Sequence, residues 1–268
     1  MLYHPAVPSE QYRYPENMPP GYRHPGESGM DYEDVRIETK DKLKLQAWFV
    51  KANPNPKVCR TLIFFHENAG CIGTRIPNLE ILVKRLNTNV LLLAYRGYSR
   101  SEGTPSEEGL ALDAEATLEY VLNRDDIDKD RLFVFGRSLG GAIATQLAMK
   151  HSNRFRGMIV ENTFTSIADM VDQIMPHVAP FKMFIQRIFY PTVDRINSVT
   201  CPILFIRGLK DEIVPCEQSK KLYDTAKSAK FKQIHEVENG DHNRTWQQGG
   251  EPYVDAFRKF FERAEKEK

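Results

Sequence analysis

Two kinds of hydrophobic pattern divide this chain. Between residues 34 and 50, apolar and polar positions alternate on either side of a short polar turn at Asp41. Such alternation is typical of a half-buried antiparallel hairpin. Farther along, the apolar residues form continuous runs, which are typical of strands covered on both faces in a parallel sheet. We expect such strands at residues 61–65, 89–95, 131–136, 157–162, 202–208 and 232–238.

Helical patterns separate these runs. The clearest begins near Thr104, which we expect to cap a helix with Pro105 in its first position and Glu107 closing a capping box. The apolar face of that helix contains Leu110, Ala114, Leu118 and Val121. In the last helix, we expect three side chains to face the core: Val254, Phe257 and Phe261. A hairpin followed by strand–helix units predicts an α/β fold with a mostly parallel, doubly wound sheet and an antiparallel amino-terminal hairpin.

The composition excludes several classes of protein. The 37 Lys and Arg residues nearly balance the 36 Asp and Glu residues, so no excess charge favours nucleic acid as a partner. The four cysteines have no zinc-ligand spacing, and we expect reduced thiols and no metal. The apolar runs are too short to cross a bilayer, and no signal peptide is evident. We therefore expect a soluble chain as the sequence stands, and no cofactor.

The stretch "FGRSLGG" turns the end of one apolar run into the start of a helix. Gly136, Ser138 and Gly140 form the G-x-S-x-G pattern of a nucleophile elbow, in which a strained serine needs small neighbours. Gly141 allows the helix to approach the sheet closely. At the helix start, free backbone N–H groups can stabilise a developing negative charge. A glycine-rich turn whose serine only caps the helix is the structural alternative.

A serine nucleophile needs a base, and in this arrangement the partners follow in the order Ser, acid, His. Asp211 lies just beyond the run 202–208, and His242 follows the next run and a turn. We therefore expect Asp211 to orient His242, which takes the proton of Ser138. Glu212 is the nearest rival for the acid. The competing histidines lie in less suitable places: His4, His24, His151, His177 and His235.

An oxyanion hole needs two backbone N–H donors. We expect one from Leu139, directly after the serine, and one from the loop that follows the run 61–65. Within that loop we favour Asn68, with Glu67 as the second choice. The pair His66 and Glu67 lacks the second histidine at helical spacing that a metal site would need.

These motifs resemble the α/β-hydrolase family of bud-emergence protein 46 and α/β-hydrolase domain-containing protein 13. The matching blocks run in order over residues ~58–260. They are "FFHENAGCIGTR", "LLLAYRGYSRSEGTPSEEGLALDAEA", "FVFGRSLGGAIA", "VENTFTSI", "PILFIRGLKDEIVP" and "GDHNRTW". The resemblance implies an α/β-hydrolase fold and places the family's nucleophile, acid and base on Ser138, Asp211 and His242. Cys71 departs from it, because the family usually has Asn there.

The sequence divides into an irregular arm at residues 1–32, rich in Pro, Tyr and Gly, and an α/β-hydrolase domain at residues 33–268. An insertion at about residues 163–199 is longer than an ordinary crossover and predicts a small helical lid. Within it, the apolar side chains of Met175, Phe181 and Phe184 suit an acyl chain of the substrate. Two helices packed on the core explain this pattern equally well.

For function, we favour hydrolysis of acyl esters or thioesters. Relatives in the resembled family remove palmitoyl groups from proteins, so an S-acylated protein is the more specific hypothesis. Family members usually carry an amino-terminal anchor, and residues 1–8 resemble the segment after it, which implies endomembrane association. Two alternatives stay open: a catalytically silent scaffold in membrane organisation or cell polarity, and a serine peptidase, which the lack of a propeller repeat disfavours. The oligomeric state is not predicted.

Overall fold

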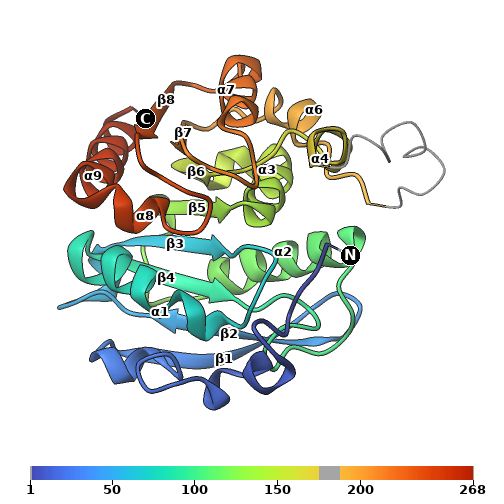
Figure 1. Ribbon diagram of the computed structural model, residues 1–268. Coiled ribbons are helices and arrows are strands. Elements are labelled where there is room, and N and C mark those ends of the chain that lie inside the picture. The colour runs from blue at the N-terminus through green and yellow to red at the C-terminus, as the bar shows by residue number, and fades with distance from the viewer. Residues whose placement is uncertain (1, 175–187, 268) are drawn as a thin grey trace. The chain divides into compact units, whose positions relative to one another are not determined.

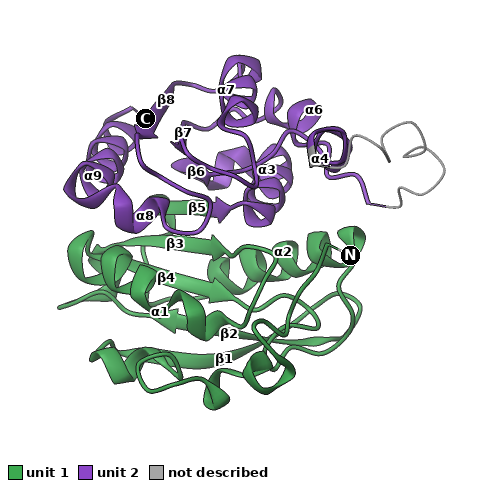
Figure 2. Cartoon of the chain, viewed as in Figure 1, with its two compact units in different colours: residues 1–135 green, residues 136–268 purple. Residues whose placement is uncertain are grey.

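The computed structural model describes residues 2–174 and 188–267 (Figure 1). The chain is divided into two compact units, residues 1–135 and 136–268 (Figure 2). The expected boundaries, an arm at residues 1–32 and one hydrolase domain at residues 33–268, stay a prediction. The described residues include no helix that is both long and apolar enough to cross a membrane.

The first unit begins with short 3-10 helices and the expected hairpin. The helices are η1 (Glu10–Arg13), η2 (Pro15–Asn17) and η3 (Pro25–Ser28). The hairpin pairs β1 (Tyr32–Glu38) with β2 (Lys44–Val50), and Tyr32 lies opposite Val50. The antiparallel pairing is confirmed, but β2 is buried on both faces from Leu45 to Val50, so this strand is not half-buried as the alternation predicted.

Two buried strands extend this hairpin. β4 (Thr88–Leu93) runs antiparallel to β2 and parallel to β3 (Arg60–Phe65). The connecting helices are η4 (Pro56–Val58), η5 (Ile72–Arg75), α1 (Ile76–Glu80), the π-helical η6 (Ile81–Arg85), α2 (Glu107–Leu122) and η7 (Lys129–Arg131). Both strands are buried along nearly their whole length, which explains their continuous apolar runs.

The start of α2 differs from the expectation. Ser106, and not Thr104, is the cap, and its Oγ accepts a hydrogen bond from the Gly109 N–H at 3.0 Å. Pro105 is outside the helix and lies against Gly97, where an added Cβ would lie 2.7 Å from the proline Cδ. The predicted inner face is confirmed, since all four of its apolar side chains are buried.

β5 (Leu132–Arg137) leads from the first unit into the second. The second unit alternates helices with β6 (Gly157–Glu161), β7 (Ile203–Gly208) and β8 (Lys232–Val237), and β7 pairs in parallel with both β6 and β8. Its helices are α3 (Leu139–His151), η8 (Ser152–Arg154), α4 (Ile167–Ile174), α6 (Thr192–Ile196), α7 (Cys216–Thr225), α8 (Thr245–Gln248) and α9 (Gly250–Lys266).

The predicted fold class is confirmed. Every strand expected from a continuous apolar run is present, and the antiparallel pairs involve only the amino-terminal strands. The inward residues of α9 are fully buried. All four cysteines are free thiols, and three of them are buried. Parts of the expected lid correspond to α4 and α6, whereas Met175, Phe181 and Phe184 lie outside the described residues.

Candidate active site

Ser138 occupies a strained corner between β5 and α3. Its φ of 52° and ψ of −119° are rarely adopted by residues other than glycine. The corner requires Gly136, because an added Cβ there would lie 2.1 Å from the Gly140 carbonyl oxygen. The Ser138 N–H donates to the Glu161 carbonyl at 2.8 Å, which ties the corner to the end of β6. The strain therefore has a local cause in the sequence and a tertiary contact that holds it.

Two side chains from distant parts of the sequence extend from Ser138 in a hydrogen-bonded series. The His242 Nε2 lies 3.0 Å from the Ser138 Oγ, and the His242 Nδ1 lies 2.7 Å from an Asp211 carboxylate oxygen. Ser138 is 6 % exposed and His242 is 4 % exposed. All three residues belong to the second unit. The structure thus brings together the serine, histidine and aspartate that the sequence singled out.

The carboxylate of Asp211 acts as a hydrogen-bond acceptor at both of its oxygens. Its second carboxylate oxygen accepts from the backbone N–H groups of Ile213 at 2.9 Å and Val214 at 2.8 Å. Since the carboxylate only accepts, the His242 Nδ1 must donate to it. The Nε2 lone pair then faces the Ser138 hydroxyl. This arrangement can remove a proton from the hydroxyl and stabilise the imidazolium that results.

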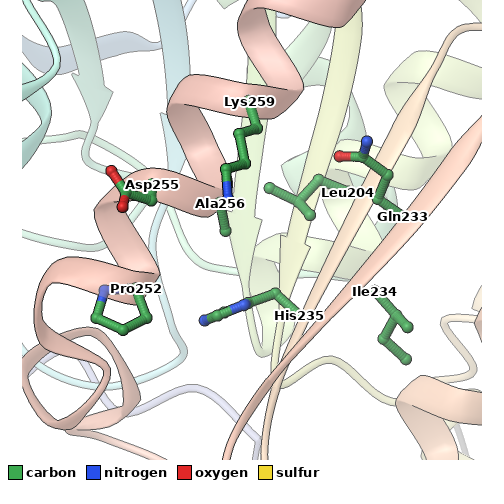
Figure 3. Close-up of a pocket in the computed structure, with 8 residues that line it drawn as sticks. All are labelled: Leu204, Gln233, Ile234, His235, Pro252, Asp255, Ala256 and Lys259. Carbon is green, nitrogen blue, oxygen red and sulfur yellow. The ribbon is translucent and has the colours of Figure 1, made fainter.

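The rival residues that the structure describes lie elsewhere, and His177 is outside the described residues. Glu212 is exposed, and His4, His24 and His151 take no part in the hydrogen bonds of Ser138. Figure 3 shows His235 on β8, with its ring directed toward α9. It lines a separate cavity of about 580 Å³ together with residues of both elements. Burial lowers the pKa of His235, which keeps its imidazole neutral in this pocket.

The two expected oxyanion donors fall in different units. Leu139 is the first residue of α3, where a backbone N–H has no acceptor within its own helix. Asn68 belongs to the first unit, where its side chain donates to the Leu2 carbonyl at 2.7 Å and its carbonyl accepts from the Tyr98 hydroxyl at 2.6 Å. Its part in an oxyanion hole stays a prediction, as does the substrate contact of Met175, Phe181 and Phe184.

A buried ion pair under the corner was not foreseen from the sequence. Arg137 Nε lies 3.0 Å from the Glu161 carboxylate, and both side chains are at most 1 % exposed. The Tyr253 hydroxyl of α9 donates to the same carboxylate at 2.7 Å. Burial and the carboxylate raise the pKa of Tyr253 well above its ordinary value, so the hydroxyl stays protonated. The signal was a charged residue ending each of two apolar runs.

Asn162 was also missed. Its buried side chain contacts the backbone of the turn that carries His242 and the end of β7. The amide that ends the run 157–162 was the available signal, but its partners are far away in the sequence. Among residues 2–174 and 188–267, no three His, Cys, Asp or Glu side chains are grouped so that they could hold a metal ion.

The chain is similar in sequence to one protein family and to several known proteins. The sequence model of the prolyl oligopeptidase family matches residues 108–264. The chain is 38 % identical to the alpha/beta hydrolase domain-containing protein WAV2 of Arabidopsis thaliana, over 100 % of this chain and 88 % of that protein. It is 37 % identical to the protein bem46 of Schizosaccharomyces pombe, over 87 % of this chain and 79 % of that protein.

Among solved structures, the esterase Pf2001 of Pyrococcus furiosus superposes with a TM-score of 0.75, covering 90 % of this chain and 93 % of that chain. Its sequence identity of 22 % supports the fold alone. The sequence relatives support more, because their identity extends over most of both chains. This chain therefore belongs to the α/β-hydrolase family of bud-emergence protein 46, within the prolyl oligopeptidase family.

Proposed function

We propose that this protein is a serine hydrolase that cleaves acyl esters or thioesters. Ser138 is the nucleophile, His242 is the general base, and Asp211 orients the imidazole. The proposal depends on one observation, the hydrogen-bond series of 3.0 Å from serine to histidine and 2.7 Å from histidine to aspartate. Membership of an α/β-hydrolase family supports it.

The reaction proceeds in two halves. The Ser138 Oγ attacks the carbonyl carbon while its proton passes to the His242 Nε2. The C–O or C–S bond then breaks, and the leaving alcohol or thiol takes the proton from His242. Water attacks the acyl-serine in the same way, and release of the carboxylic acid restores the hydroxyl. Asp211 accepts a hydrogen bond from the His242 Nδ1 and stabilises the imidazolium cation.

The oxyanion of each tetrahedral intermediate needs donors held ready before the reaction. We assign the Leu139 N–H to this role because it opens α3 directly after the nucleophile. We assign the Asn68 N–H as the second donor because its loop follows β3, the position that the family motif gives to this donor. Each such donor contributes a factor of about 10²–10³ in kcat in serine hydrolases.

For the substrate class, we favour a long acyl chain and, more specifically, an S-acylated protein. The insertion around residues 163–199 is rich in apolar side chains, and Met175, Phe181 and Phe184 are the ones we assign to the chain. The family resemblance supports depalmitoylation and a membrane-associated location. A thioester is also a more activated acyl group than an oxygen ester, so one triad serves both substrates.

The test begins with Ser138→Ala. This variant should lose turnover of p-nitrophenyl esters and covalent labelling by a fluorophosphonate. Ser99→Ala is a matched control, because Ser99 is also a buried serine with positive φ, and its Oγ accepts only from a backbone N–H in the described contacts. Unchanged labelling and turnover of Ser138→Ala would remove the proposal because another residue would then be the nucleophile, whereas no labelling of the natural chain would favour a catalytically silent scaffold.

The substrate class has its own test. Hydrolysis rates should rise from acetyl to longer acyl esters, and an S-palmitoyl peptide should be cleaved. Equal rates along the series would argue against an acyl-fitting pocket. The match to the prolyl oligopeptidase family makes a peptidase the second candidate. Faster cleavage of a proline-containing p-nitroanilide than of any ester would favour that activity.

A further inference from the structure

Two residues at the end of β6 and just beyond it, Glu161 and Thr163, contact the corner that carries Ser138. The Glu161 carbonyl accepts the Ser138 N–H at 2.8 Å, and the Thr163 hydroxyl donates to the Ser138 carbonyl at 2.7 Å. The corner is thus held from both sides by residues that flank Asn162. The nucleophile segment and Asn162 therefore have a defined spacing through the backbone.

Asn162 itself extends to the other two segments of the triad. Its Oδ1 accepts from the N–H of Gly208, which ends β7 three positions before Asp211, at 2.9 Å. Its Nδ2 lies 3.2 Å from the carbonyl oxygen of His242. One planar amide therefore connects the strand end that leads to the carboxylate with the residue that supplies the imidazole.

Two further contacts of the same Nδ2 strengthen the link to the His242 turn. The Asp241 carbonyl lies at 3.3 Å and the Thr245 Oγ1 at 3.0 Å. The Thr245 hydroxyl in turn donates to the Asp241 carbonyl at 2.5 Å. The turn around His242 is thus hydrogen-bonded both within itself and to Asn162. A shift of the Asn162 amide would therefore also shift this turn.

The backbone of Asn162 has a conformation that few residue types adopt without strain. Its φ is 47°, a left-handed conformation that costs an ordinary residue about 1–2 kcal/mol and that asparagine tolerates better than most. The residue is 2 % exposed, and its N–H donates to the Ile206 carbonyl at 3.0 Å. An amide is the side chain of this length that offers an acceptor and donors at the same time.

We propose that Asn162 is a positioning residue that sets the distance between the Asp211 and His242 segments, and so keeps the imidazole between hydroxyl and carboxylate. This inference rests on the proposed function, because positioning matters for turnover only if the triad is active. Asn162 does not touch the reacting atoms. It acts through the backbone of Gly208 and His242.

The first variant is Asn162→Gly, which keeps the positive φ and removes the amide. We expect kcat for a p-nitrophenyl ester to fall about 10- to 100-fold, since displacement of a catalytic group by about 1 Å costs up to that much. KM should change less than twofold. Asn87→Gly is the matched control, because Asn87 also has a positive φ of 49° but is exposed and lies in the other unit. It should keep the kcat of the natural chain.

The second variant, Asn162→Asp, preserves the size of the side chain and replaces the donor with an acceptor. Its carboxylate can still accept from Gly208, but it faces the carbonyls of Asp241 and His242 without a donor. We expect the same loss of kcat in a protein whose far-UV spectrum is native. A kcat within twofold of the natural chain in either folded variant would overturn the inference, even if the melting temperature falls.

A readout independent of turnover separates this inference from the proposed function. The proton between His242 and Asp211 gives a far-downfield NMR signal when the short hydrogen bond is intact. That signal should weaken or vanish in Asn162→Gly and persist in Asn87→Gly. If the natural chain neither cleaves esters nor reacts with a fluorophosphonate, the proposed function fails, whereas an unchanged signal in Asn162→Gly overturns the positioning role by itself.

Discussion

Two buried histidines, one in each unit, differ in whether their imidazole can act as a base. His242 in the second unit is 4 % exposed, and both of its ring nitrogens face oxygen atoms of other side chains. His66 in the first unit is fully buried at the end of β3. Its Nδ1 donates to the Glu67 carbonyl at 2.6 Å, and its Nε2 has no hydrogen-bond partner among the described residues.

The surroundings of His66 explain the contrast. Its ring packs 4.2 Å from the ring of Tyr95 and 5.3 Å from that of Tyr98, measured between centroids. Burial lowers the pKa of His66 to about 3, and the Arg75 charge acts in the same direction. His66 is therefore a neutral packing group, whereas His242 has a carboxylate that can stabilise its cation. Burial alone makes a histidine inert, and a partner on each nitrogen makes it a base.

The largest expected effect tests the partner of His242. In Asp211→Asn the amide can donate to the His242 Nδ1, which favours the tautomer with hydrogen on Nε2 and prevents proton removal from Ser138. We expect kcat to fall by about four orders of magnitude with little change in KM. Ester hydrolysis measured by stopped-flow or long incubation covers this range.

The neighbouring carboxylate provides the control for this experiment. Glu212 is exposed, and Glu212→Gln should keep the kcat of the natural chain. If Asp211→Asn stays within tenfold of the natural chain, His242 does not depend on its carboxylate partner, and the contrast with His66 loses its basis.

The next effect concerns the ion pair that supports the Ser138 corner. Glu161→Gln leaves Arg137 buried without its carboxylate, and such a loss costs about 3–5 kcal/mol of the free energy of unfolding. Urea unfolding at pH 7 measures it. Asp224→Asn, which breaks the exposed pair with Lys220, should cost less than about 1 kcal/mol. Similar costs for the two variants would contradict a special role for burial.

The smallest effect is the pH dependence that His66 imposes on stability. The unfolded chain binds a proton at this histidine below its ordinary pKa of 6.5, whereas the folded chain does so only near pH 3. The contribution of His66 is therefore complete above pH 6.5 and is lost as the pH falls toward 3. Between pH 7 and pH 5 this loss amounts to about 2 kcal/mol.

Comparison of the natural chain with His66→Gln isolates this contribution. Urea unfolding at several pH values gives the free energy of unfolding of the natural chain minus that of His66→Gln. We expect this difference to be constant above pH 7.5 and to fall by about 2 kcal/mol at pH 5, because only the natural chain loses the contribution of His66. A difference independent of pH would mean that His66 has the same pKa in the folded and the unfolded chain, and the two histidines would then not differ as described.

The sequence by itself determined the fold class and the three triad candidates. Continuous apolar runs marked the strands because burial on both faces leaves no polar positions, as in β3 and β4. The corner at Ser138 was recognisable because Gly136 is required locally, by the backbone of Gly140 and Gly141. Asp211 and His242 could be placed because chemistry gathers where successive parallel strands end.

The tertiary structure alone decided the contacts between distant segments. Ser106, and not Thr104, caps α2, and Pro105 lies outside the helix against Gly97, a contact that local propensity does not take into account. The link from Asn162 to Gly208 and His242 joins residues 46 and 80 positions apart. A hydrogen bond is directional and acts over about 3 Å, so its partners follow from coordinates and not from the order of residues along the chain.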